Sequence, residues 1–199
     1  MSTSTMPITN EEKIQTAKTK KDLGDQAFKT GDTRAALKSY HEALMYLLGL
    51  DKNAMAASMG GSSAPPIGSE QPEKPKTEAD EIIEKIYANM SACHLKHENW
   101  KRTVETADKV LAKNPNHYKA RFRKGKALGE QGFFEKALKV LEDLKSKNSE
   151  DTAIVNAEIA RLRAIDNERE RAHRQKLKGF LTRDKGEKKV AAEETSASA

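Results

Sequence analysis

The spacing of apolar and small residues along this chain predicts helices throughout. In the stretch that follows Asp32, such residues recur every three or four positions and so fall on one helix face: Ala36, Tyr40, Ala43, Leu44 and Leu47. No alternation of apolar and polar residues reaches strand length, and strand-forming residues are sparse. The pattern therefore predicts an all-α protein.

Local start and stop signals divide this helical pattern into pairs. Thr9 can cap a first helix, with Glu12 completing a capping box, and that helix is expected to run to about Thr30. Gly31 then ends it and Asp32 caps a second helix, which predicts a helical hairpin over 10–50. Similar signals predict two more hairpins over 77–147, at Thr77, Asn99, Asn114–Asn116 and Gly132.

The remaining segments have other compositions. We expect 1–9 to be a disordered N-terminus and the Pro/Gly/Ser-rich segment 51–76 to be a flexible insertion. A C-terminal helix is expected over 148–182, followed by a disordered tail over 183–199. The apolar face of that helix is predicted to consist of Ile154, Ile159, Leu162 and Ile165.

The three predicted hairpins share a period of 34 residues. Ser91 and Gly125, the close-packing positions of the second and third hairpins, are 34 residues apart, and Gly24 precedes Ser91 by one period plus a 33-residue insertion. Repeats of this length bury their apolar faces by stacking, and the C-terminal helix would cap the last one. Stacking in phase also places equivalent positions of the first helices on one concave wall, where a ligand would lie.

At this period the sequence resembles the tetratricopeptide repeat. The match rests on small and aromatic positions that recur in phase: Gly24, Ala36, Tyr40 and Ala43, then Tyr87, Ser91 and Pro115, then Gly125 and Ala137. Thr103 and Ser149 depart from the pattern, which usually has Ala and Pro there. The resemblance implies three helical hairpins stacked as a short right-handed superhelix, with the long C-terminal helix as a cap.

The positive charge of the chain is confined to one segment. Residues 161–189 hold eleven Lys and Arg against five Asp and Glu, which accounts for the whole net charge of +6. The rest of the chain is balanced, so any attraction to a polyanion belongs to the C-terminal helix. Phe180 is the one aromatic residue in that segment, and the alternation of Arg and Glu over 168–171 is also typical of a solvated helix.

The sequence offers no pattern for catalysis or for a cofactor. The five histidines form no HExxH motif, Cys93 has no second cysteine to pair with, and no glycine loop is placed to cradle a phosphate. We therefore expect a protein that is not an enzyme and that needs no cofactor or metal. Cys93 is expected to be a small buried side chain.

One constellation points to binding. Lys21 and Asp25 are four residues apart on the first predicted helix, Asn89 lies on the third, and Lys119 and Arg123 are four apart on the fifth. In register all five would face one groove, which would suit an extended peptide rich in carboxylates. The alternative is that these side chains form an ordinary solvated helix face.

The segments that carry these residues are similar to those of tetratricopeptide co-chaperones that grip the C-terminal Glu-Glu-Val-Asp of heat-shock proteins 90 and 70. On that pattern Lys21, Asn89, Lys119 and Arg123 match, whereas Asp25 stands where the family has Asn. An ionised Asp donates no hydrogen bond and repels a ligand carboxylate, so we expect it to weaken binding. Within this family, YHEALMYLLGLD, the insertion after it and RAHRQKLKGFL resemble the tetratricopeptide repeat protein 9 group.

These features predict a cytoplasmic, monomeric adaptor or co-chaperone without a membrane span, whose groove binds the C-terminal peptide of heat-shock protein 90 or 70. The alternative is a general protein–protein scaffold whose basic C-terminal helix contacts RNA, the ribosome or another polyanion. Nucleic acid is not the partner that the leading interpretation predicts.

Overall fold

In a computed structural model, the described residues are 9–48, 50, 76–147 and 152–197, with side chains described as far as Phe180. These residues form seven helices and no strand, as the all-α prediction requires. The helices are α1 (Asn10–Lys29), α2 (Thr33–Leu47), α4 (Glu78–Lys96), α5 (Trp100–Lys113), α6 (Tyr118–Glu130), α7 (Phe134–Lys147) and α8 (Thr152–Ala197). The predicted insertion over 51–75 and the N-terminal residues 1–8 lie outside the described residues.

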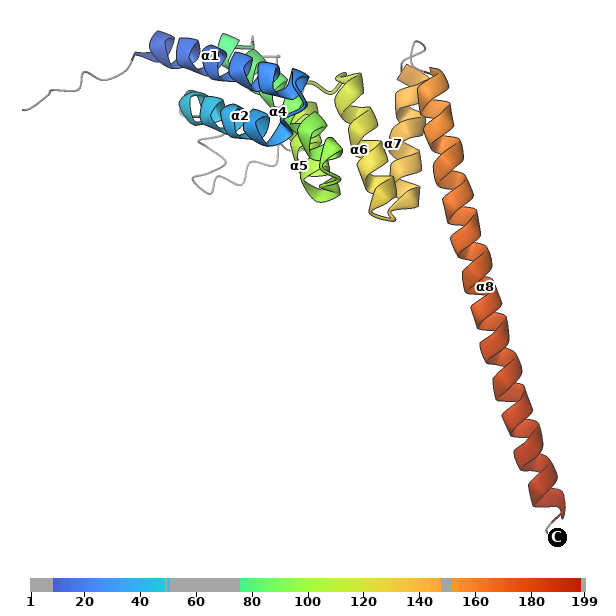
Figure 1. The fold of residues 1–199 in the computed structure, drawn as a ribbon. Coiled ribbons are helices and arrows are strands. Elements are labelled where there is room, and N and C mark those ends of the chain that lie inside the picture. Colours follow the sequence, from blue (N-terminus) through green and yellow to red (C-terminus); the bar gives the residue numbers. More distant parts are fainter. Residues whose placement is uncertain (1–8, 49, 51–75, 148–151, 198–199) are drawn as a thin grey trace, which may run out of the picture. The chain divides into compact units, whose positions relative to one another are not determined.

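The chain divides into two compact units, 1–144 and 145–199. Within the first unit, α1 pairs with α2 and α4 pairs with α5, while α2 contacts α4 and α5 contacts α6 (Figure 1). The first helices of successive hairpins also touch, because α4 contacts both α1 and α6. This arrangement places α1, α4 and α6 in series with α4 in the middle.

Side-chain caps fix the helix starts where the sequence predicts them. Thr9 and Glu12 form a complete capping box at α1, and Thr77 and Asp80 form another at α4. Each satisfies backbone N–H groups that have no partner within the helix. Between α1 and α2, Gly31 has a φ of 90°, a conformation that favours glycine, so the chain turns back at once into the next helix.

Small residues let the helices of a hairpin approach closely. A Cβ atom on Gly24 would lie 2.6 Å from Cε1 of Tyr40, and one on Gly125 would lie 2.7 Å from Cδ2 of Leu141. Tyr40, Leu141 and Ser91 are fully buried. At Gly24 and Gly125, a side chain of the partner helix therefore fills the space that a Cβ atom would need. The ring of Tyr40 packs against Gly24, which directs the Tyr40 hydroxyl toward α1.

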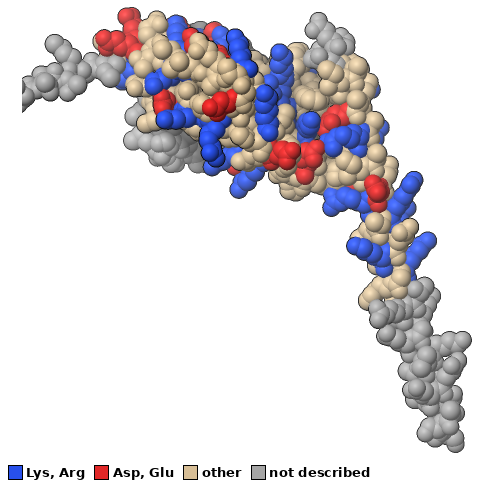
Figure 2. Space-filling view, viewed as in Figure 1, with Lys and Arg blue, Asp and Glu red and all other residues tan. Residues whose placement is uncertain are grey.

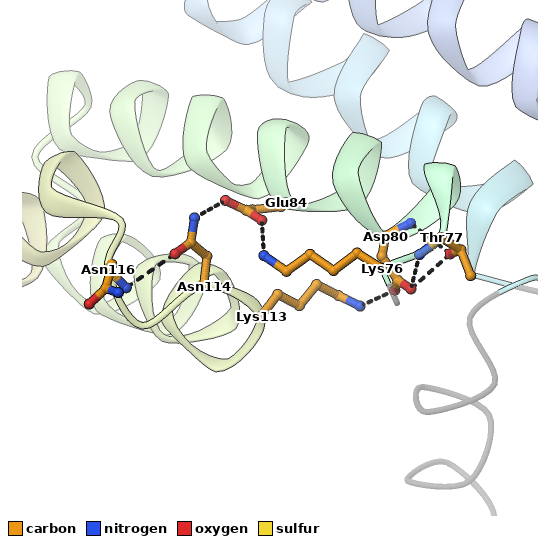
Figure 3. Close-up of polar contacts among 7 residues, drawn as sticks. All are labelled: Lys76, Thr77, Asp80, Glu84, Lys113, Asn114 and Asn116. Carbon is orange, nitrogen blue, oxygen red and sulfur yellow. Dashed lines mark hydrogen bonds and ion pairs between the residues drawn. The ribbon is translucent and has the colours of Figure 1, made fainter. Parts of the chain in front are cut away.

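A polar network joins the start of α4 to the end of α5 (Figure 3). The carboxylate of Asp80 accepts from Thr77 and pairs with Lys113 at 2.7 Å. Glu84, one turn further along α4, accepts a hydrogen bond of 2.7 Å from Asn114. Burial alone raises the pKa of Asp80, but its bonds to Lys113 and Thr77 outweigh burial and hold the pKa below its ordinary value. This network locks the second hairpin at the end where the chain enters it.

The C-terminal helix α8 corrects two sequence predictions. Its buried apolar residues are Val155, Ile159 and Leu162, whereas Ile154 is 60% exposed. The buried side chains follow an i, i+4, i+7 spacing, which leaves Ile154 out of phase with them. The helix also continues to Ala197 instead of ending near 182, since 183–197 contains no proline and is rich in Lys, Glu and Ala, which favour helix. None of the described helices is long and apolar enough to cross a membrane.

Candidate functional site

The five predicted site residues lie on the three first helices that adjoin one another. Lys21 and Asp25 are on α1, Asn89 is near the middle of α4, and Lys119 and Arg123 are on the first two turns of α6. Because α4 contacts both α1 and α6, its central turn can meet side chains from both sides.

Asp25 is the centre of a hydrogen-bond network that joins three helices. Its Oδ2 accepts from Lys21 Nζ at 2.6 Å, while its Oδ1 accepts from the Tyr40 hydroxyl at 2.7 Å and from Asn89 Nδ2 at 2.8 Å. The donors come from α1, α2 and α4. Hydrogen bonds to an ionised acceptor are stronger than those between neutral groups, so this cluster also ties the first hairpin to the second.

The network shifts the ionisation of both its titratable donors. Burial lowers the pKa of Lys21, but the hydrogen bonds and charges of Asp25 and Asp22 outweigh it and hold that pKa above its ordinary value. Burial, and then the bond to Asp25, raise the pKa of Tyr40 far above its ordinary value. At neutral pH, Lys21 is therefore a cation and Tyr40 a neutral hydrogen-bond donor.

Arg123 reaches the same turn of α4 from the other side. Its Nη1 donates to the backbone oxygen of Ala88 at 2.8 Å and to Oγ of Ser91 at 3.1 Å. Burial lowers the pKa of Arg123, although a guanidinium stays charged at neutral pH. Nε and Nη2 of Arg123 make no hydrogen bond to the described residues. Every fully buried side-chain nitrogen or oxygen among these residues has a partner, so Nε and Nη2 must reach solvent.

Lys119 differs from the other four residues. It lies one turn before Arg123 on α6, its side chain is exposed, and it makes no hydrogen bond or ion pair with the described residues. Lys119 and Arg123 thus form a cationic pair on one helix, without an acidic partner in the described part of the chain. The structure brings Lys21, Asp25, Asn89 and Arg123 around the 88–91 turn of α4, and it leaves Lys119 at the edge of that cluster.

Sequence reasoning missed three groups at this site: Tyr40, Ser91 and the Ala88 carbonyl. Tyr40 and Ser91 were identified from the repeat pattern only as packing residues, and both use their hydroxyls here. A hydroxyl at a buried repeat position signals a polar role, because a buried hydroxyl needs a partner. Cys93 is fully buried beside these groups; burial raises its pKa to about 11, and nearby charges, Arg123 and Asp25 among them, act more weakly.

Two of the five histidines make structural hydrogen bonds. His97, at the end of α4, shares a hydrogen bond of 2.7 Å with Thr33 at the start of α2. His117 caps α6, because its Nδ1 accepts from the backbone N–H of Ala120. No group of three metal-ligating side chains is found among the described residues.

Charge is distributed differently in the two units. On the face in Figure 2, Lys and Arg alternate with Asp and Glu over the helical hairpins, whereas the described part of α8 carries mostly Lys and Arg. Over 161–180 the sequence has seven basic and three acidic residues. Residues 167–180 are all exposed.

Comparison with known proteins identifies the fold. No protein-family model matches the chain. The C-terminal TPR-containing domain of a putative FK506-binding protein from Plasmodium falciparum superposes with a TM-score of 0.64 at 22% identity, covering 82% of this chain and 96% of that domain. The fold is a tetratricopeptide-repeat array. The first TPR domain of Spaghetti (RPAP3), solved bound to the HSP90 peptide SRMEEVD, is similar at a TM-score of 0.53 and 16% identity, covering 76% of this chain and 96% of that domain.

A curated relative supports this assignment from sequence. FK506-binding protein 5 of Rhizopus delemar is 29% identical over 132 residues, which are 66% of this chain. The aligned part is 30% of that relative's length, so this tetratricopeptide-repeat chain spans less than a third of the protein it matches. These likenesses show the fold, with co-chaperone repeat domains among the structural neighbours.

Proposed function

We propose that this protein is a non-catalytic tetratricopeptide adaptor or co-chaperone whose α1–α4–α6 face binds the acidic C-terminal peptide of heat-shock protein 90 or 70. The observation that carries the proposal is the cationic pair on α6. Lys119 is exposed and pairs with none of the described residues, and Arg123 is held against α4 by one nitrogen while its other donors reach solvent. An anchored guanidinium beside a free ammonium is suited to carboxylates, because the fork is already oriented.

Two further observations support this assignment. Asn89 on α4 lies one residue from the carbonyl that anchors Arg123, and its amide donates to Asp25, so the cationic pair and the Asp25 network meet on the same turn of α4. The neighbour bound to SRMEEVD shows that a domain of this fold takes such a peptide. Membership of the tetratricopeptide repeat protein 9 group and a cytoplasmic location are part of the same proposal.

The test is fluorescence anisotropy with labelled Met-Glu-Glu-Val-Asp. Lys119→Ala and Arg123→Ala each remove a charge-assisted hydrogen bond, worth about 1.5–3 kcal/mol, and should weaken binding about ten- to hundredfold. Lys101→Ala is the matched control, because Lys101 is an exposed lysine on α5, which supplies none of the proposed site residues. The circular dichroism of all variants should match that of the wild type. If Lys101→Ala lowers affinity as much as the α6 variants do, the peptide is held by general charge and the site is wrong.

The basic part of α8 supports a second candidate function. Its exposed surface over 167–180 carries an excess of Arg and Lys, which would attract RNA, the ribosome or another polyanion. Retention on heparin measures this attraction. A variant with Arg171, Arg174, Lys176 and Lys178 changed to Gln should elute at lower salt while its peptide affinity stays unchanged. Equal elution of the two proteins would remove this candidate.

A further inference from the structure

The Lys21–Asn89 side of the proposed site already holds a carboxylate. It belongs to Asp25, whose two oxygens accept from Lys21, Tyr40 and Asn89 at 2.6, 2.7 and 2.8 Å. Donors from three helices converge on one carboxyl group. The geometry that a ligand carboxylate would require is therefore present, and a side chain of the protein fills it.

Charge divides the site into two unlike ends. On α1, Lys21 pairs with Asp25 and lies near Asp22, with 3.4 Å between Nζ of Lys21 and Oδ1 of Asp22. These three residues sum to a formal charge of −1. On α6, Lys119 and Arg123 sum to +2 with no acidic partner among the described residues. A carboxylate that approaches is attracted to the α6 end and repelled from the α1 end.

We propose that Asp25 is a specificity-determining residue that occupies the Lys21–Asn89 end of the site. One ligand carboxylate then binds Lys119 and Arg123, and a second carboxylate is excluded from the α1 end. This inference rests on the proposed function. The ligand class that fits is a peptide with its acidic groups at one end and a neutral or hydrogen-bonding group at the other.

Displacement of Asp25 is the reason for the exclusion. To reach Lys21 and Asn89, a second carboxylate must either break the bonds that Asp25 makes or share the donors with a like charge at contact distance. Tyr40 cannot follow an incoming ligand, because its ring is fully buried and seated against Gly24. Asp25 thus competes with any ligand carboxylate at every encounter, at a local concentration fixed by the fold.

The test is a double-mutant cycle with two labelled probes, acetyl-Met-Glu-Glu-Val-Asp as the free acid and as the C-terminal amide. The proteins are the wild type, Lys21→Met, Asp25→Asn and the double variant. Asp25→Asn should bind the free acid at least tenfold more tightly than the wild type. Lys21→Met should change wild-type affinity less than twofold, because the charge of the Lys21 ammonium is already balanced by its ion pair with Asp25. In the Asp25→Asn background, the same change should abolish the gain.

The amide probe and a matched variant complete the test. Discrimination of free acid from amide should be small for the wild type and at least fivefold for Asp25→Asn. Asp22→Asn makes the same charge change beside the same lysine, but Asp22 is 69% exposed and touches Lys21 weakly, so its effect should stay below threefold. Asp25→Ser, which also removes the charge, should tighten binding in the same direction and replaces Asp25→Asn if that protein is unstable.

The possible failures separate the two proposals. Wild-type binding that weakens tenfold in Lys21→Met, with no gain in Asp25→Asn, would overturn the role of Asp25 and leave the peptide site standing. An equal gain in Asp22→Asn and Asp25→Asn would also overturn it, since general charge would then explain the effect. Failure of every variant to bind either probe would sink the proposed function itself.

Discussion

The hydroxyl of Tyr40 offers a sharp test of the Asp25 network as a stabilising element. Tyr40→Phe removes one donor and keeps the ring, so no cavity opens over Gly24. A hydrogen bond to a charged acceptor contributes about 1.5–3 kcal/mol. The side chain of Asp25 is 29% exposed and keeps two other donors, so water can partly replace the hydroxyl. We therefore expect a loss near the lower limit, about 1.5 kcal/mol.

Urea and thermal unfolding, followed by circular dichroism, measure this loss. For a chain of this size, about 1.5 kcal/mol corresponds to a fall in Tm of roughly 3–6 °C. Tyr46→Phe is the matched control, because Tyr46 is partly buried on the same helix and its hydroxyl makes no hydrogen bond with the described residues. In an Asp25→Asn background, Tyr40→Phe should cost less, since the acceptor is then neutral. A loss in the wild-type background no larger than that of Tyr46→Phe would refute the network as a source of stability.

Three further measurements follow from the structure. Native Cys93 should resist thiol reagents at pH 8 and react fully in denaturant, because it is buried and its pKa is raised to about 11. Burial lowers the pKa of His117, so below about pH 6.5 the unfolded chain binds more protons than the folded chain. The free energy of unfolding should therefore fall as the pH is lowered from about 7.5 to about 5.5. The fall should be less steep in His117→Asn than in the control His173→Asn, which changes an exposed histidine. Leu162→Ala should cost about 2–5 kcal/mol and Ile154→Ala under about 0.5, and equal costs would contradict the phase of α8.

The parts of the fold that could be predicted depend on interactions over short sequence distances. The capping boxes at Thr9 and Thr77 each involve residues three apart, and Gly31 ends α1 through its own backbone preference. The repeat period then places the close-packing residues without knowledge of any contact. These features depend on neighbouring residues or on the repeat period, so the hairpins can be predicted before any tertiary structure is known.

The Asp25 network could not be derived in the same way. Asp25 is 15 residues from Tyr40 and 64 from Asn89, and its partners are fixed only when α2 and α4 pack beside α1. The sequence predicted that Asp25 would face a ligand; the structure shows that its carboxylate is satisfied by the protein. The error over Ile154 has a different origin, because the i, i+4, i+7 spacing of Val155, Ile159 and Leu162 is visible in the sequence and Ile154 lies one position out of phase with it.

The central position of α4 has a consequence for local unfolding. Since α4 contacts α1, α2, α5 and α6, it cannot open without releasing the hairpins on both sides, whereas the first hairpin can detach from one neighbour alone. Backbone amides over 86–93 should therefore exchange with deuterium only through global unfolding. The amides of α1 should exchange through a partial opening that requires less free energy. Lys21 and Asp25 would leave in such an opening, while Asn89 and the carbonyl that anchors Arg123 stay folded. The two ends of the proposed peptide site would thus have different lifetimes in the same molecule.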